Sequence, residues 1–110
     1  MTISNFYQGT TKVFSGTISF NAAAPNISGD GVKFLMKKEL TDTDANAAIN
    51  SAANVATAGA SGIYTVTLSK AVTDIPVGIY HYEIIWTLAS TAEYVLEQDV
   101  VTVLERVEDV

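Results

Sequence analysis

The chain has 110 residues, of which 48% are apolar and 16% are charged, and its formal net charge is −6 at pH 7. This length suffices for one domain with a core of its own, and such a composition argues against general disorder. The acidic balance disfavours nucleic acid and anionic membrane surfaces as partners, and a chain without cysteine cannot be held together by disulfides.

The sequence predicts neither a targeting segment nor a membrane span. Its first residues lack the basic segment and the apolar run of a signal peptide. No apolar run approaches the ~20 residues that a transmembrane helix needs. We therefore expect a single domain over residues 1–110.

Residues 1–9 precede the first clear strand pattern. This segment carries Ile3, Phe6 and Tyr7 ahead of Gly9. It is either the first strand of the domain's own sheet, which we favour, or an arm whose three large side chains contact a neighbouring subunit.

A half-buried strand is predicted over residues 12–20, because apolar residues alternate there with small hydroxylated ones. The face expected in the core carries Phe14, Gly16, Ile18 and Phe20. A glycine in the core phase indicates either room for a large neighbour or a bulge. Glycine, proline and asparagine in residues 21–31 predict a loop.

Residues 32–40 alternate in the same way. The core face carries Val32, Phe34 and Met36, and the other face carries Lys33, Leu35, Lys37 and Glu39. We expect this second face to be solvated.

Residues 41–62 differ in character, because Ala, Asn, Ser and Thr dominate them. Asp42 and Asp44 could cap a short helix over 45–54. They could instead form turns that lead into a thin edge strand over 47–56. Alanine favours the helix and the all-β character of the remaining chain favours the strand, so the sequence leaves both open.

The longest pattern runs through residues 74–88. Pro76 prevents a strand ladder from starting earlier, and Gly78 permits a bend of the backbone. From there the core face carries Tyr80, Tyr82, Ile84, Trp86 and Leu88, and the opposite face carries Ile79, His81, Glu83, Ile85 and Thr87. The preceding strand, over 63–69, has a core face of Tyr64, Val66 and Leu68, and one helical turn is expected over 70–74.

The spacing around Pro76 also predicts how these two strands are joined. In immunoglobulin-like domains a tyrosine at the start of the sixth strand hydrogen-bonds back across the preceding corner. Leu68, Pro76, Gly78 and Tyr80 are well placed to form such a corner.

The last strand is predicted over residues 93–104. Its valines at 100, 101 and 103 cannot all share one face with Tyr94 and Leu96, and a bulge near Asp99 would reconcile them. Residues 105–110 are expected to be a charged, frayed tail.

Together these elements predict an all-β fold, namely an immunoglobulin-like β-sandwich of about seven strands without a disulfide. The predicted core consists of Phe14, Ile18, Phe20, Phe34, Met36, Tyr64, Val66, Tyr82, Ile84 and Trp86.

The residues that could carry chemistry are few. His81 is the single histidine, and it lies on the strand face away from the predicted core. Asp42, Asp44 and Asn46 match the start of a calcium loop, but the positions that need Gly and Glu hold alanine. We therefore predict no catalytic residue, no metal ligand and no cofactor site.

Four stretches together resemble a known family. They are Asn5-Phe-Tyr-Gln-Gly-Thr-Thr-Lys-Val-Phe14, the region from Val32 to Ile49, Gly62-Ile-Tyr-Thr-Val-Thr-Leu68, and Asp74-Ile-Pro-Val-Gly-Ile-Tyr-His-Tyr-Glu-Ile-Ile85. In this order they resemble small immunoglobulin-like proteins of tailed bacteriophages and prophages, including the N-terminal domain of baseplate upper proteins. The resemblance implies a structural virion component in the tail, baseplate or head surface, without catalytic residues, and an edge strand within 47–56. The chain lacks the long C-terminal extension of the baseplate protein, which leaves its position in a particle open.

Two functions of different classes are therefore expected. The first is an interaction module of a phage particle, assembled in the bacterial cytoplasm, with other virion proteins or further copies of itself as partners. The alternative is a carbohydrate- or surface-binding module of a bacterial cell-surface protein. A small enzyme is disfavoured, because the single histidine has no thiol partner.

Overall fold

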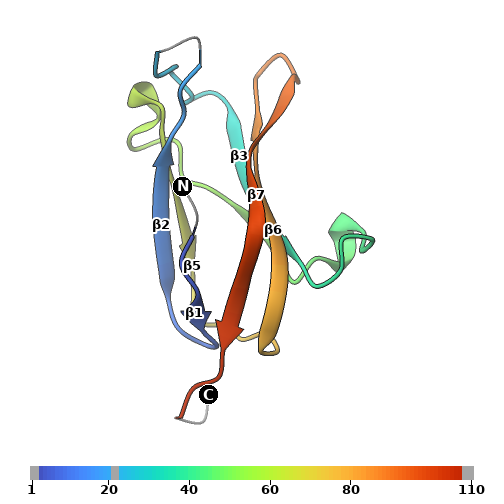
Figure 1. Ribbon diagram of the computed structural model, residues 1–110. Coiled ribbons are helices and arrows are strands. Elements are labelled where there is room, and N and C mark those ends of the chain that lie inside the picture. Colours follow the sequence, from blue (N-terminus) through green and yellow to red (C-terminus); the bar gives the residue numbers. More distant parts are fainter. Residues whose placement is uncertain (1–2, 21–22, 108–110) are drawn as a thin grey trace.

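The computed structural model describes residues 3–20 and 23–107, in which the chain forms strands and two short 3-10 helices (Figure 1). The strands are β1 (Phe6–Tyr7), β2 (Lys12–Thr17), β3 (Gly31–Lys37), β4 (Ile49–Ala52), β5 (Ile63–Leu68), β6 (Gly78–Thr87) and β7 (Glu93–Leu104). The 3-10 helices are η1 (Asp44–Asn46) and η2 (Gly59–Ser61). The structure is thus all-β, as the alternating patterns predicted.

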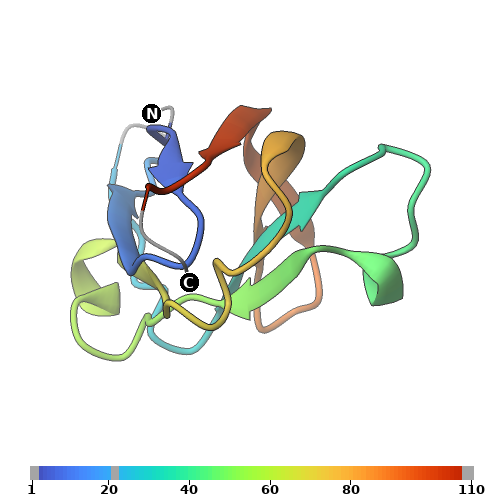
Figure 2. The same ribbon diagram turned by 90° about the horizontal axis from the view of Figure 1, so that it is seen from below.

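The strands form two sheets that face each other across the core (Figure 2). The larger sheet has five strands in the order β1-β7-β6-β3-β4, and the smaller sheet pairs β2 with β5. All pairs are antiparallel except β1 with β7. An immunoglobulin-like sandwich likewise joins its third, sixth and seventh strands in one sheet opposite the second and fifth.

The core lies between the two sheets and confirms most of the predicted buried residues. Buried members of the predicted set are Ile18, Phe34, Met36, Tyr64, Val66, Tyr82, Ile84 and Trp86. Phe14 is half-buried and packs edge-on against Phe34, with ring centroids 5.3 Å apart. At these positions the predicted strand phase matches the observed burial.

The expectation that Phe20 belongs to the core is wrong. β2 ends at Thr17, and the backbone of Phe20 bridges instead to Ala23. The Phe20 side chain is 43% exposed, and its ring lies edge-on to Trp86 with centroids 5.8 Å apart. It covers the end of the core without entering it, because the strand that carried the alternation has stopped.

The N-terminal segment packs on its own domain. Phe6 pairs with Val103 and Tyr7 with Leu104 in the parallel ladder between β1 and β7. Ile3 and Phe6 are buried in the core, whereas Tyr7 is exposed. The favoured own-sheet interpretation is confirmed, and Ile3 and Phe6 are not available as partner contacts.

The ambiguous region contains the edge strand. β4 pairs antiparallel with β3, and the alternative helix over 45–54 is wrong, because only η1 is helical there. Asp42 accepts a hydrogen bond from the Glu39 amide through Oδ2 at 3.1 Å, as a turn residue does. The segment expected to form one helical turn does form a turn, in which the Thr73 amide donates to the Ser69 carbonyl oxygen at 3.1 Å.

A bulge does reconcile the two halves of β7, but it lies three residues before the predicted position. Ile84 pairs with Glu97 and Ile85 with Val95, so Leu96 is the extra residue. Leu96 packs against the core, and Glu97 and Asp99 lie opposite the core-facing residues Ile84 and Tyr82. The bulge therefore turns two carboxylates toward the inner side of the sheet.

The remaining expectations concern the corner and the chain ends. The predicted corner is present, because the Tyr80 hydroxyl donates to the Pro76 carbonyl oxygen.

In the expected charged tail, Arg106 Nη1 donates to the Gly9 carbonyl oxygen at 3.4 Å, and residues 108–110 lie outside the described residues. Residues 1–2 of the N-terminal segment and 21–22 of the predicted loop also lie outside them. No helix in the described ranges has the length and apolar character needed to cross a membrane.

Candidate interaction face

The outer face of the larger sheet is the surface that points away from the smaller sheet. Side chains alternate along a strand, so the residues between the core positions project outward. The outer face carries Lys33, Leu35 and Lys37 of β3, Ile79, His81, Glu83 and Ile85 of β6, and Val95, Gln98 and Val100 of β7. In the register, Leu35 lies beside Glu83, and Glu83 lies beside Gln98.

Large apolar side chains are prominent on this outer face. Ile79 is 59% exposed, Val95 57% and Val100 46%. Leu35 and Ile85 also belong to this face, yet both are buried by their neighbours. The expectation that the second face of β3 is solvated is therefore wrong at Leu35, because neighbouring side chains cover it.

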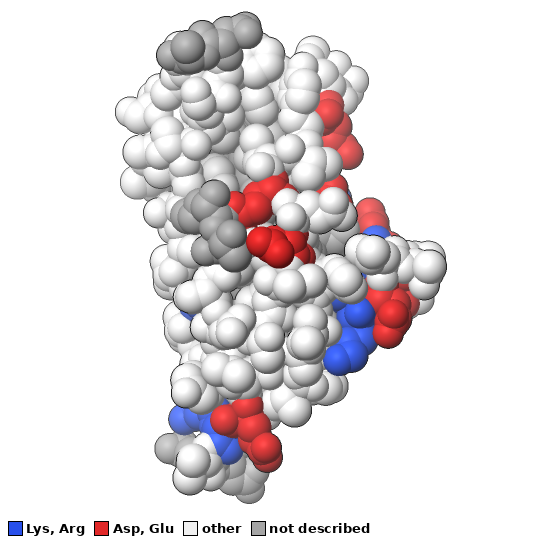
Figure 3. Space-filling view, viewed as in Figure 1, with Lys and Arg blue, Asp and Glu red and all other residues white. Residues whose placement is uncertain are grey.

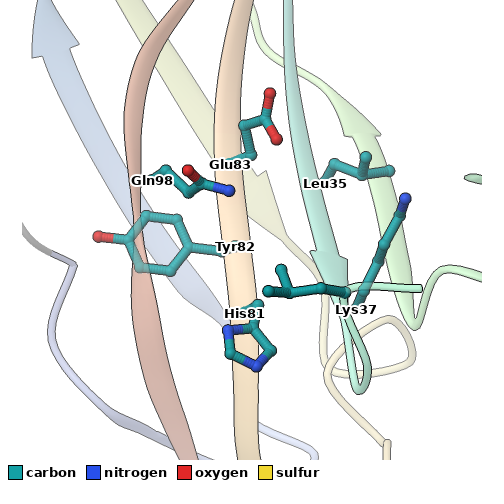
Figure 4. Close-up of a pocket in the computed structure, with 7 residues that line it drawn as sticks. Leu35, Lys37, His81, Tyr82, Glu83 and Gln98 are labelled. Carbon is teal, nitrogen blue, oxygen red and sulfur yellow. The ribbon is translucent and has the colours of Figure 1, made fainter. Parts of the chain in front are cut away.

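A shallow hollow of about 130 Å³ opens on the outer face, and Figure 4 shows the side chains around it. Its lining consists of Leu35, Lys37, Leu40, His81, Tyr82, Glu83 and Gln98. Pockets for drug-sized ligands usually measure roughly 300–1,000 Å³. This hollow is suited to one side chain of a partner rather than to a whole small molecule.

His81 lies in this hollow beside two charged residues. It pairs in register with Lys37 on one side and with Val100 on the other, and Glu83 follows on the same face. The lining contains no serine or threonine, and the hydroxyl of its one tyrosine, Tyr82, donates to Glu97. Within residues 3–20 and 23–107, no three histidine, aspartate or glutamate side chains gather as metal ligands.

One ion pair fixes the segment beside the hollow. Lys37 Nζ lies 2.8 Å from Asp44 Oδ1, and this hydrogen bond, with the lysine charge, lowers the pKa of Asp44. The ion pair joins the end of β3 to η1, and Leu40, which lines the hollow, lies between them in the sequence. Asp42 therefore stabilises a turn, and Asp44 forms an ion pair with β3, so both carboxylates have partners within the chain.

A second opening, the side groove, lies between β2 and β7 and has a volume of about 210 Å³. Its lining consists of Gly16, Thr17, Ile18, Ser19, Tyr64, Leu96 and Glu97. Glu97 accepts a hydrogen bond from the Tyr82 hydroxyl through Oε2 at 2.6 Å. Burial and then the Glu97 charge raise the pKa of Tyr64. Sequence reasoning missed Glu97, because its inward direction follows from the bulge at Leu96.

An aromatic cluster closes one end of the sandwich. The Trp86 ring lies 5.5 Å from Tyr94 and 5.8 Å from Phe20, measured between centroids. Trp86 Nε1 donates to Asp30 Oδ2 at 2.9 Å, and Asp30 Oδ1 accepts from the Ala89 amide. Phe20 and Tyr94 thus present exposed ring surface around a buried indole.

In comparisons with known proteins, no protein-family model matches the chain, and no curated protein matches it.

Proposed function

We propose that the protein is a non-catalytic structural component of a bacteriophage or prophage particle, in its tail, baseplate or head surface. The observation that carries this proposal is the exposure of large apolar side chains on the outer face. Ile79, Val95 and Val100 are exposed on this face, which also carries a hollow that fits a single side chain. The resemblance to immunoglobulin-like phage proteins supports the particle as the setting.

The composition of the outer face suits contact with another protein. Interfaces combine apolar and polar side chains, and aliphatic or aromatic anchors fill small pockets in them. Lys33 and Glu83 supply charges of both signs on this face. A virion component would have other virion proteins as partners, and the particle would assemble in the bacterial cytoplasm.

Purified particles from the bacterium that carries the gene test the proposal. Mass spectrometry should detect the wild-type protein in the particles. The Val100→Glu variant should be lost from them, because a carboxylate would be buried at the contact. The matched control Val72→Glu changes an exposed valine outside the outer face and should still be incorporated. Particles that never contain the wild-type protein would contradict the proposal.

The aromatic cluster favours one second candidate, a carbohydrate- or surface-binding module. Ligand sites are often lined by aromatic side chains with a few polar groups nearby, as Phe20, Tyr94 and Asp30 are arranged. Trp86 contacts both exposed rings, so its fluorescence should report a bound sugar. A saturable change with bacterial glycans that is lost in Tyr94→Ala would favour this candidate.

A further inference from the structure

The strand edges of this sandwich are not equally protected. On β7, the Val100 amide donates to Asp99 Oδ1 at 2.8 Å and the Thr102 amide donates to Asn5 Oδ1 at 3.0 Å. β5 is bridged at Thr65 by Asn54, and β4 is a short strand of four residues. β2 has six residues and pairs only with β5 among the described strands. It is therefore the longest edge without such protection.

The phase of the β2 ladder shows which backbone groups are open. The Ile18 amide donates to the Gly62 carbonyl oxygen at 2.8 Å, which continues the register of β2 with β5. In an antiparallel pair, hydrogen-bonded residues alternate with residues whose N–H and C=O groups point away. The outward backbone groups of β2 are therefore those of Val13, Ser15 and Thr17.

We infer that β2 is a self-association edge, on which β2 of a second copy pairs antiparallel about a two-fold axis at Ser15. In this register Ser15 lies opposite itself, and Val13 lies opposite Thr17 of the second copy. The outward N–H and C=O groups of all three residues then face one another. A two-fold contact must be self-complementary in this way.

The side chains suit this register. Val13, Ser15 and Thr17 share the outer side of β2; hydroxyl side chains opposite each other can hydrogen-bond in sheets, and β-branched residues favour strands. Val13 is 56% exposed, and the second copy would cover it. The side groove begins at Gly16 and Thr17, so an added strand would also narrow its mouth.

Charge favours this edge over other surfaces. Two copies of net charge −6 repel each other, so a contact is least costly where acidic residues are absent. Residues 13–17 carry no charge, and Lys12 would lie opposite Ile18 of the second copy. In Figure 3 the surface over β2 is almost entirely uncharged, whereas acidic atoms gather across the middle of the view.

This inference concerns the isolated chain and goes beyond the proposed function, so either one can fail without the other. It is tested first by cross-linking, because the chain contains no cysteine. Hydrogen-bonded residues opposite each other have Cα atoms about 5.5 Å apart, which a disulfide can bridge. The Ser15→Cys variant should therefore form a covalent dimer under mild oxidation. The control Thr67→Cys places the thiol on the same outer side but on β5, and it should cross-link far more slowly.

Sedimentation equilibrium between about 10 μM and 1 mM then measures the dimer without cross-linking. The wild type and Ser15→Ala should both dimerise. Ser15→Pro should weaken the dimer by about tenfold or more, because two hydrogen bonds at the axis are lost. Proline is tolerated where an edge N–H faces solvent, and circular dichroism checks that this variant is folded. A wild type that stays monomeric, a folded Ser15→Pro variant that dimerises normally, or equal cross-linking of the two cysteine variants would overturn the inference.

Discussion

The Tyr80 hydroxyl donates a hydrogen bond of 2.6 Å to the carbonyl oxygen of Pro76, four residues earlier in the chain. The bond spans the entry to β6, where Gly78 has a φ of 143° that a residue with a Cβ rarely adopts. The Tyr80 ring is buried, and Lys38 Nζ lies 4.9 Å from its centroid. This tyrosine therefore fixes both the corner and the start of the central strand.

We expect Tyr80→Phe to lower the free energy of unfolding by about 1 kcal/mol, the usual net value of one hydrogen bond. The ring would stay in place, so only the contact with Pro76 is lost. Urea denaturation monitored by circular dichroism measures the change. Tyr94→Phe, in an exposed ring, is the matched control and should leave the midpoint unchanged. Equal midpoints for wild type and Tyr80→Phe would reject the importance of the corner bond.

Trp86 provides a prediction about the core. Its side chain is 3% exposed, so its native fluorescence should be that of a buried indole and should shift to longer wavelength on unfolding. Trp86→Ala should cost about 3–5 kcal/mol, because it leaves a cavity between the sheets. Tyr94→Ala removes a ring that contacts the same indole from the surface and should cost clearly less. A native spectrum typical of a solvated indole would contradict this placement.

Gly16 provides a prediction about close packing. A Cβ atom at this position would lie 2.5 Å from Tyr64 Oη and 2.7 Å from Tyr64 Cζ. Because Tyr64 is buried, Gly16→Ala should lower stability by about 1–3 kcal/mol. The control Gly29→Ala has no atom within 4 Å of its new methyl group and should change stability by less than about 0.5 kcal/mol. Similar losses in the two variants would show that Tyr64 does not depend on the glycine.

These residues also show what the sequence could predict. Alternation identified Phe34, Val66 and Ile84 as core residues, because a side-chain period of two leaves only one way to bury large residues. The corner was predictable from the order Pro76, Gly78 and Tyr80, since each has a backbone role that few residues share. Gly16 was expected either to leave space for a large side chain or to mark a bulge, and the sequence did not show that Tyr64 fills this space.

The errors arose where tertiary contacts outweigh local pattern. Phe20 keeps the phase of β2 but lies beyond its end, so it covers Trp86 from outside. Leu35 alternates with core residues yet is buried on the outer face by its neighbours. The bulge at Leu96 depends on how β7 pairs with β6, and the sequence of one strand does not determine its register with the other. The side groove with Glu97 was unpredictable for the same reason.

The last prediction concerns the dependence of stability on pH. The Tyr82 hydroxyl donates to Glu97 Oε2 at 2.6 Å and accepts from the Ile3 amide at 3.2 Å. Burial and then the bond to Glu97 raise the pKa of Tyr82 to about 12, from an ordinary value of 10.0. Between these two values the folded protein keeps a proton that the unfolded chain has lost. The free energy of unfolding should therefore fall as pH rises through this window, by up to about 1.4 kcal/mol per pH unit.

Urea denaturation from pH 8 to about pH 12 measures this slope, and Tyr82→Phe separates the contribution of Tyr82 from the other tyrosines. Burial also raises the pKa of Tyr80, so part of the alkaline loss should persist in the variant. At neutral pH the variant should be less stable by about 1–3 kcal/mol, because the buried Ile3 amide loses its acceptor. Above pH 10 the difference between variant and wild type should shrink, because only the wild type still loses the stability that the protonated Tyr82 provides. Tyr7→Phe removes a hydroxyl from an exposed ring and, as the control at neutral pH, should leave the stability unchanged. Parallel curves for wild type and Tyr82→Phe across this range would show that the bond to Glu97 does not hold the proton.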